Sequence, residues 1–401
     1  MGVDRISYLP PFIIHQIMSH LSRKQVAQTS ILSKKWNYLL ASFPIFNFDE
    51  TDLFQSEFDI LAAEKDVKEL DITIKTDDKR LYIFPHIIYS AKLLTTLRLN
   101  GFKFEKPPDT IRFFFLKKLE LVRVHISETV VEKLTSECVL LEELYFRRCW
   151  GLKCVCICKP DELKILQIHI APSELERVKV DILGLQQLDL VLYQRLCEID
   201  VSGCSQLKDL RLACCLFCDE EFHYLLSQFP LLENLSVSSC FVIKRIKISS
   251  DRLKNLSIGY CSDLEAIDVD TPNLLSFGYE YNSVPLSSMN APCPWKVRLV
   301  IEHDLDTNWY LKLKKFLASE IKELTLRCTL NEVSFDLEEF RNGSPSPPCK
   351  VGYVSLSPTI LSSDYGALLD ALLWICYPKC LVVETWNNDH INLIEVQSSY
   401  H

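Results

Sequence analysis

The sequence predicts an α+β chain with a three-helix N-terminal unit, a long solenoid of short strands, and a small β–α–β cap at the carboxyl end. Three observations support this: helix signals crowd the first fifty residues, a Leu-x-x-Leu-x-Leu pattern recurs along the middle, and a breaker-rich segment near residue 345 precedes a strand–helix–strand pattern. One compact core would be unusually large at 401 residues, since cores stop growing at roughly 250–300 residues. A stack of units, each packed only on its neighbours, is therefore favoured.

The first predicted unit, residues 4–49, is helical. Leu9 and Pro10 precede a helix in which Ile13, Ile17 and Leu21 share one face. A second apolar stripe runs beside the first, and a helix that is apolar on two sides normally packs against two bodies. Residues 22–25 form a capping box for a second helix, and Trp36 lies in a third that ends before a proline. So small a unit buries little apolar surface, and we expect a partner to complete it.

The middle of the chain, residues 60–341, is repetitive. The first leucine of each Leu-x-x-Leu-x-Leu unit from Leu94 to Leu274 follows its predecessor by 22, 25, 22, 22, 22, 25, 21 and 21 residues. A fixed period in the twenties with this pattern is typical of leucine-rich repeats, in which each unit supplies one short strand. The leucines then point into a shared core and the x positions face outward.

The returning limbs between these strands are predicted to be of two kinds. Residues 196–201, 243–248 and 264–269 repeat the apolar pattern half a unit later and predict strands, whereas residues 219–226 predict a helix. Five cysteines stand three residues after the last apolar position of a unit, where a small side chain turns inward; these are Cys149, Cys204, Cys215, Cys240 and Cys261. We expect them to be packing residues.

No pattern for catalysis or metal binding is found. Cys154, Cys156 and Cys158 alternate on one predicted strand face, but no second matching pair completes a zinc site, so we expect no metal and no cofactor. Only 10 residues are glycine and none forms G-x-G, which disfavours most nucleotide-dependent enzymes. Histidine and serine motifs of hydrolases are also missing, and paired acids such as Glu142 and Glu143 are interpreted as solvated. We therefore expect a non-catalytic protein.

Composition limits the class of partner and the compartment. The chain has 44 basic and 53 acidic residues, a formal charge of −9, without a basic stripe, so nucleic-acid binding is not expected. Apolar runs are too short for a membrane span. The polar, proline-containing start does not resemble a signal peptide. We therefore expect reduced thiols and a cytoplasmic or nuclear location.

The carboxyl end is predicted to be a separate cap over residues 349–401. Residues 342–348 are a turn-rich linker with four breakers. Beyond it, residues 355–357 and 380–385 predict strands, and the segment from Asp364 to Ile375 predicts a helix between them. Such a β–α–β unit would cover the last open layer of a solenoid.

Several of these segments resemble a known family. Asp4-Arg5-Ile6-Ser7-x-Leu9-Pro10 and Leu32-Ser33-Lys34-Lys35-Trp36 resemble an F-box of the plant F-box/leucine-rich-repeat type, and residues 84–101 resemble the first full repeat of that family. Residues 369–379 resemble its C-terminal segment, although the longer module named FBD is not complete.

The resemblance implies a substrate-recruiting subunit of a Skp–cullin–F-box ubiquitin ligase. Its F-box would bind a Skp-type adaptor, and through it cullin and RING subunits, using Leu9, Pro10, Ile13, Ile17, Leu21 and Trp36. The repeats would bind an unknown protein substrate. The alternative is a small-molecule hormone co-receptor of the same architecture, which requires a convergent basic cluster that the scattered arginines do not obviously supply.

The predicted target surface lies at x positions of successive middle strands. It consists of Tyr145, Arg147, Gln167, His169 and Arg211. Tyrosine and arginine are the residue types that most often anchor interfaces. The alternative is that these residues are only the polar side of a solvated sheet.

Overall fold

The computed structural model describes most of the repeated region and little of the N-terminal unit. The described residues are 9–10, 13–14, 17, 45–48, 67–74, 81–170, 175–193, 197–281, 286–290, 295–302, 305–317, 321–329, 334–359, 365–387 and 390–397. Ile13, Ile14 and Ile17 are helical, but the rest of the three predicted helices lies outside the described residues. The chain divides into two compact units, residues 1–192 with 197–204 and residues 193–196 with 205–401.

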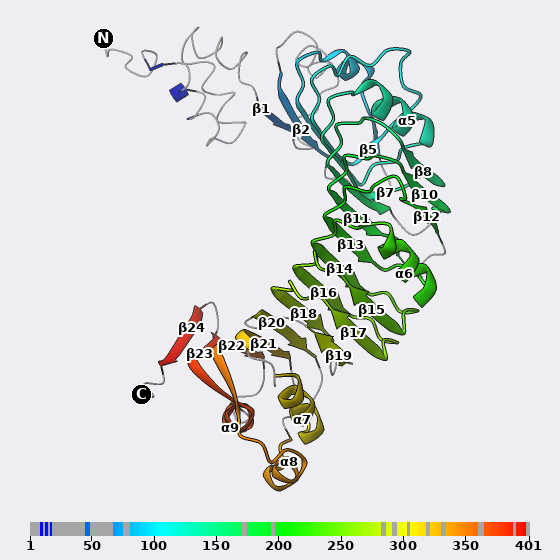
Figure 1. Cartoon of the computed structure of the whole chain (residues 1–401). Coiled ribbons are helices and arrows are strands. Elements are labelled where there is room, and N and C mark those ends of the chain that lie inside the picture. The colour runs from blue at the N-terminus through cyan, green and yellow to red at the C-terminus, as the bar shows by residue number, and fades with distance from the viewer. Residues whose placement is uncertain are drawn as a thin grey trace, which may run out of the picture. The chain divides into compact units, whose positions relative to one another are not determined.

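The first unit is built on one parallel sheet (Figure 1). Its strands lie in the order β1 (Ile45–Phe48), β2 (Glu69–Thr73), β4 (Thr96–Asn100), β6 (Lys118–Val122), β7 (Glu143–Cys149), β9 (Ile165–Ile170) and β11 (Gln187–Val191). The returning limbs supply β8 (Cys154–Ile157), β10 (Arg177–Val180) and β12 (Glu198–Asp200) as a second sheet, the helix α5 (Glu128–Glu137), the 3-10 helix η3 (His86–Ser90), and the short pair β3 (Tyr82–Ile83) and β5 (Phe102–Lys103).

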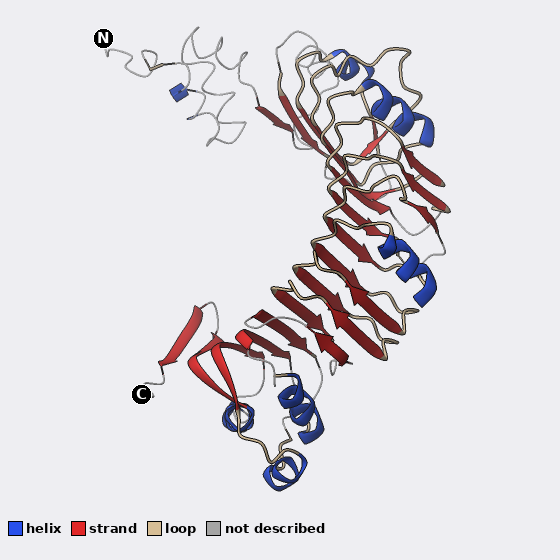
Figure 2. Ribbon diagram, in the orientation of Figure 1, coloured by secondary structure: helices blue, strands red, loops and turns tan. Residues whose placement is uncertain are grey.

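The second unit repeats this arrangement (Figure 2). Its main sheet contains β13 (Asp209–Ala213), β14 (Asn234–Ser238), β16 (Asn255–Gly259), β18 (Ser276–Glu280), β20 (Trp295–Ile301), β21 (Ile321–Thr329), β22 (Cys349–Thr359) and β23 (Cys376–Asn387) in parallel, with β24 (His390–Gln397) antiparallel at the end. The other elements are β15 (Arg245–Ser249), β17 (Ala266–Asp270) and β19 (Leu286–Asn290), which form a second sheet, and the helices α6 (Asp219–Ser227), α7 (Thr307–Phe316), α8 (Leu337–Gly343) and α9 (Tyr365–Ile375). None of the helices in the described residues is long and apolar enough to cross a membrane.

Equivalent leucines of the predicted repeats pair across neighbouring strands. Leu97 of β4 lies opposite Leu119 of β6, which lies opposite Leu144 of β7, and each is at most 1% exposed. Because parallel strands are about 4.8 Å apart, this register stacks leucine on leucine into one continuous core. The side chains at the x positions between them point to the opposite face of the sheet, as predicted.

The predicted returning limbs are confirmed for the described residues. β12, β15 and β17 are the three predicted strands, and α6 covers the predicted helix. The structure adds α5, which was not predicted. It buries Val130, Val131 and Leu134.

The helical limbs α5 and α6 are each attached in the same way to the limb that follows. In α5, the Oε1 atom of Glu128 accepts hydrogen bonds from the backbone N–H groups of Lys153 (2.7 Å) and Cys154 (3.3 Å) at the start of β8. In α6, the Oδ1 atom of Asp219 accepts from Lys244 (2.8 Å) and Arg245 (3.1 Å) at the start of β15. A first-turn carboxylate, which also favours the positive end of the helix dipole, therefore fastens each helix to the strand that follows it.

The carboxyl end differs from the predicted separate cap in one respect. The strand–helix–strand pattern is confirmed as β22, α9 and β23, but β22 pairs in parallel with β21, so the sheet continues past the predicted linker. The linker itself is held by Lys314, which is 4% exposed and donates to the carbonyl oxygens of Ser344 (3.3 Å) and Ser346 (2.5 Å). Residues 342 and 343 of the predicted linker are the end of α8, and residues 344–348 connect α8 to β22, so the sheet does not end at the breakers.

Six main strands, β4, β6, β7, β13, β14 and β16, have a residue with left-handed backbone conformation at or just after their end. Gly101 has φ +85° there, and the equivalent residues include Arg123 (48°), Ser239 (53°) and Tyr260 (53°). The left-handed turn aims each backbone N–H at the next strand. For example, Gly101 donates to the Val122 carbonyl at 3.1 Å and Ser239 to that of Gly259 at 2.8 Å.

We predict opposite effects of glycine substitutions at these turns. Gly101→Ala introduces a Cβ atom 2.8 Å from the Ile74 carbonyl oxygen at positive φ, and should lower the free energy of unfolding by about 1–2 kcal/mol or more. Ser239→Gly relieves the same conformation and should be neutral or stabilising by up to about 1 kcal/mol. Urea unfolding midpoints measure both. A more stable Gly101→Ala protein would contradict the account.

Candidate functional site

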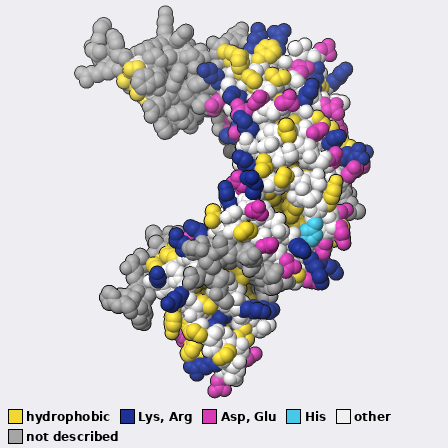
Figure 3. All heavy atoms as spheres, in the orientation of Figure 1, with side chains coloured by type: hydrophobic (Ala, Val, Ile, Leu, Met, Phe, Trp, Pro, Cys, Tyr) yellow, Lys and Arg dark blue, Asp and Glu magenta, His cyan; other side chains and the backbone are white. Residues whose placement is uncertain are grey.

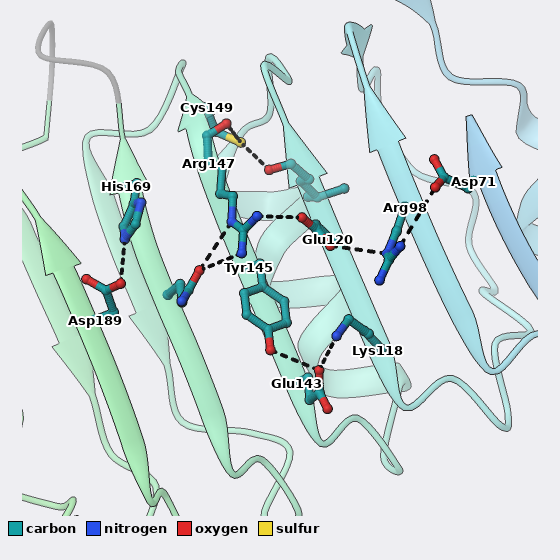
Figure 4. A network of polar contacts seen from close by, with 12 residues as sticks. Asp71, Arg98, Lys118, Glu120, Glu143, Tyr145, Arg147, Cys149, His169 and Asp189 are labelled. Atoms are coloured by element: carbon teal, nitrogen blue, oxygen red, sulfur yellow. Dashed lines mark hydrogen bonds and ion pairs between the residues drawn. The ribbon is translucent and has the colours of Figure 1, made fainter. Parts of the chain in front are cut away.

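The open face of the first unit's main sheet, meaning the side opposite the leucine core, carries a cross-strand polar network (Figure 4). The Nε atom of Arg98 on β4 lies 3.2 Å from Oε2 of Glu120 on β6, and Nη1 of Arg147 on β7 lies 2.9 Å from Oε1 of the same carboxylate. Arg147 also donates two hydrogen bonds to Oε1 of Gln167 on β9, at 3.2 and 3.1 Å. Four neighbouring strands are therefore joined by one chain of charged and polar contacts.

Glu120 is the centre of this network. Its side chain is only 14% exposed, whereas those of Arg98 and Arg147 are 47% and 44% exposed. The carboxylate therefore lies low between two arginines, and each guanidinium still faces solvent on one side. Because a guanidinium group has five N–H donors, Arg98 and Arg147 can each donate to a further partner while still bound to Glu120.

Tyr145 has a different environment from the one predicted. It lies on the open face of β7, but it is only 8% exposed. Its hydroxyl donates to Oε2 of Glu143 at 2.9 Å, while the Lys118 Nζ atom and the Arg147 Cζ atom lie 4.9 and 5.3 Å from the ring centroid. Desolvation and this hydrogen bond raise the pKa of Tyr145 to about 12. Tyr145 therefore packs against Lys118 and Arg147 and has little exposed surface with which to contact a target.

The remaining predicted target residues are divided between the units. His169 lies on β9, and its Nε2 atom is 3.0 Å from Oδ2 of Asp189 on β11. Tyr145, Arg147, Gln167 and His169 are thus brought together on two adjacent strands, as predicted. Arg211 belongs to the second unit, where it lies on β13 opposite Ser236 of β14.

A charged row lies at the start of the same strands. Oε1 of Glu142 is 2.8 Å from the Lys117 Nζ atom, and Oε2 is 2.9 Å from that of Lys164. Hydrogen bonds from both ammonium groups lower the pKa of Glu142 to about 2. The sequence predicts that Glu142 and Glu143 are solvated acids. In the structure, each carboxylate also forms an ion pair with a lysine of a neighbouring repeat.

The sequence interpretation missed an apolar edge of the first unit. Three exposed residues, Leu93, Phe115 and Leu140, occupy the same position three residues before β4, β6 and β7, and Phe114 and Val139 extend the row. The next repeats have Glu162 and Gly184 at this position. The signal was present in the sequence, since these are the residues directly before the first leucine of each repeat.

The predicted adaptor residues are described only in part. Ile14 is fully buried, whereas Ile13 and Ile17 are partly exposed and Pro10 is exposed. The Pro10 carbonyl accepts hydrogen bonds from the N–H groups of Ile13 (3.1 Å) and Ile14 (3.2 Å), which opens the helix. Leu9 is partly exposed. Leu21 and Trp36 lie outside the described residues, so the predicted roles of both remain predictions.

The cysteines fall into two groups. The five predicted to pack in the core are at most 3% exposed, and the Sγ atom of Cys149 donates to the Leu121 carbonyl at 3.3 Å. Cys154, Cys156 and Cys158 are exposed instead, so packing does not explain them. Within the described ranges, no group of three or more His, Cys, Asp or Glu residues is arranged to hold a metal ion.

We predict that the Glu142 pairing contributes to stability in a pH-dependent way. The pKa of Glu142 falls from 4.5 to about 2 on folding, so its contribution is complete above pH 4.5 and is lost as the pH falls toward 2. Glu142→Gln should lower the urea midpoint at pH 6, and the difference from wild type should shrink below pH 4.5. Glu105→Gln, which removes an exposed loop carboxylate, is the control. An unchanged midpoint for Glu142→Gln at pH 6 would refute the prediction.

Three family models match the chain. The F-box domain matches residues 6–48, the leucine-rich repeats of the FBD-associated F-box protein At5g56370 match residues 58–202, and the leucine-rich-repeat domain of At1g61320/AtMIF1 matches residues 184–334. The first matched region lies within the predicted F-box, residues 4–49, and the second covers the first half of the predicted repeats, residues 60–341. The third matched region includes α6, the sheet of β15, β17 and β19, and the main strands as far as β21.

Curated relatives from Arabidopsis thaliana have F-box and LRR-repeat in their names. The chain is 25% identical to F-box/FBD/LRR-repeat protein At5g56420 over 215 residues, 43% of this chain and 50% of that protein. It is 31% identical to F-box/LRR-repeat protein At3g59250 over 158 residues, 35% of this chain and 36% of that protein. The matches thus span half or less of these relatives. The chain therefore carries an F-box domain followed by leucine-rich repeats, and it is similar to plant F-box/leucine-rich-repeat proteins.

Proposed function

We propose that this chain recruits a target protein to a Skp–cullin–F-box ubiquitin ligase. Proteins with an F-box and leucine-rich repeats generally act as substrate receptors of such ligases. The observation that carries the proposal is the F-box match at residues 6–48 directly before two consecutive repeat matches in one chain. One part would bind the ligase and the other the target.

The adaptor surface is proposed to be the exposed side of the first helix of a three-helix F-box. Ile14 is buried on one side, while Pro10, Ile13 and Ile17 keep exposed surface on the other. Leu9, Leu21 and Trp36 complete the proposed set. A Skp-type adaptor covering this side would link the chain to cullin and RING subunits, and would add the apolar burial that so small a helical unit lacks.

The repeats are proposed to form a solenoid, closed by the C-terminal β–α–β unit, that presents the target. In the first unit, β4, β6, β7 and β9 are parallel and stay in register as far as Arg147 and His169, which keeps the open face continuous there. On that face Arg147, Gln167 and His169 offer donors and partial exposure, supported by Tyr145, and Arg211 offers a further cation in the second unit. The chain itself would perform no chemistry. Its effect on ubiquitin transfer would come from proximity, in the cytoplasm or the nucleus.

The co-receptor alternative is weakened by the polar network. A small-molecule co-receptor of this architecture requires arginines that converge on an anion. Arg98 and Arg147 are instead directed at the same carboxylate, Glu120. Arg98 also lies 3.9 Å from Oδ2 of Asp71, so the two arginines face two carboxylates within the sheet, which favours contacts with a protein surface of mixed charge.

We predict that the exposed side of the first helix is required for adaptor binding. Ile13→Ala combined with Ile17→Ala should weaken binding of a purified Skp-type adaptor by about ten-fold or more, since truncated interface anchors cost about 1–2 kcal/mol each. Isothermal titration of the full-length chain measures this. Arg147→Glu, far along the sequence on β7, should leave adaptor affinity unchanged. Equal affinity of wild type and the double variant would sink the assignment.

We predict that Arg147 contributes to target binding and Arg98 does not. Both arginines pair with Glu120 and have similar exposure, so Arg98→Glu is the control for loss of that ion pair. Arg147 also donates to Gln167, so the urea midpoints of both variants are compared as well. Partners trapped in cells with the ligase blocked, counted by mass spectrometry, should fall several-fold for Arg147→Glu alone, with adaptor recovery unchanged in both. Equal partner recovery from the two variants would place the target elsewhere, with the apolar edge of Leu93, Phe115 and Leu140 as the next candidate.

A further inference from the structure

The second unit contains a half-open cavity of about 670 Å³ between α6, β15 and the turn that follows β15. This volume lies within the range of about 300–1,000 Å³ that is usual for ligand sites. The cavity is on the side of the returning limbs, not on the open face of the main sheet, and its lining comes wholly from residues 223–253. It is therefore separate from both surfaces discussed above.

The cavity has a structural cause. The N-terminal half of α6 is fastened to β15 by Asp219, and by His223, whose Nε2 atom accepts a hydrogen bond from the Lys247 N–H at 3.0 Å. Beyond His223 the helix runs on for one more turn while β15 gives way to a turn. A helical limb is thicker than a strand limb, so the space between the end of α6 and the end of β15 is not filled.

The lining is apolar at the floor and basic at the rim. Phe229, Ile248 and Leu253 are buried at 3%, 6% and 1% exposure and form part of the floor. Lys247 and Arg252 are exposed at the rim, and within the described residues neither has a carboxylate oxygen within 4.0 Å of its side-chain nitrogens. Asp251 is the single acidic residue of the lining. Figure 3 shows Lys and Arg side chains, with Asp and Glu side chains among them, around a histidine in the region of β15.

Hydroxyl groups complete the rim. Ser249 and Ser250 line the cavity, and the Ser250 Oγ atom accepts hydrogen bonds from the backbone N–H groups of Arg252 (3.2 Å) and Leu253 (3.3 Å), which fixes the turn. Because Nε2 of His223 is an acceptor, its Nδ1 atom carries the proton of the neutral ring. The polar groups of the rim are therefore mainly donors, and donors with positive charge suit an anionic acceptor.

We propose that this cavity binds a small amphipathic anion, with its apolar body on the floor formed by Phe229, Ile248 and Leu253 and its carboxylate or sulfonate group between Lys247 and Arg252. The proposal does not depend on ligase recruitment, because it rests only on the shape and charge of the cavity. The ligand class is set by the lining: a neutral apolar molecule would leave the cations unused, and a purely polar anion would leave the floor exposed to water.

The test uses two fluorescent probes of similar aromatic size on the full-length chain. 8-Anilinonaphthalene-1-sulfonate carries one anionic group, and N-phenyl-1-naphthylamine is neutral. The sulfonate should bind at one saturable site. Lys247→Gln with Arg252→Gln should weaken it about ten-fold or more, while affinity for the neutral probe changes less than about two-fold. The matched control, Lys244→Gln with Arg245→Gln, removes the same charge from the same region outside the cavity and should leave both affinities unchanged.

A blocking variant distinguishes the cavity from general surface binding. Ser227 lines the cavity and is exposed, so Ser227→Trp should fill the space without disturbing the core and should abolish binding of both probes, with an unchanged thermal midpoint. The proposal is overturned if the wild-type chain does not bind the sulfonate probe. It is also overturned if the two charge-removing pairs weaken binding equally, or if Ser227→Trp binds as wild type does.

Discussion

Constant register between parallel strands is the constraint on which the rest of the structure depends. Each main strand sets its leucines against the same positions of the next strand, as Leu97, Leu119 and Leu144 show. A slip by one residue would move every leucine of a strand to the solvent face and every polar x residue into the core. The same register that builds the core therefore aligns the x positions. It sets Glu120 opposite Arg98 on one side and Tyr145 on the other, and Arg147, two residues further along β7, reaches Glu120 diagonally.

Because the main strands are equivalent in every repeat, the repeats differ mainly in their returning limbs. The length of a repeat indicates whether its limb is a strand or a helix. Repeats of 21 or 22 residues return as strands where described, whereas the two of 25 residues, starting at Leu116 and Leu207, contain α5 and α6. A helix rises about 1.5 Å per residue and a strand about 3.3 Å, so a helical limb needs more residues to cover the same span. The fastening of each helix by Glu128 or Asp219 to the next strand follows from this common geometry.

This relation also shows how far the sequence could predict the fold. The strand positions and the inward cysteines followed from periodicity, because burial dictates them. The helix α6 was predicted from its own pattern, yet α5 was missed although its repeat has the same length. The exposure of Cys154, Cys156 and Cys158 and the low exposure of Tyr145 depend on which neighbours cover them. Such neighbours come from other repeats, and periodicity within one repeat does not specify them.

The open face and the cavity would bind their partners in two different ways. On the open face, neighbouring repeats satisfy each other's charges, so binding there requires a partner that can compete for Arg147 or accept from its free side. At the end of α6, the change from a helical to a strand limb leaves volume beside two exposed cations, Lys247 and Arg252. Regular stacking thus produces surfaces that are electrostatically balanced. A change in limb type leaves space between neighbouring limbs, and it is there that a small ligand finds both an apolar floor and exposed positive charge.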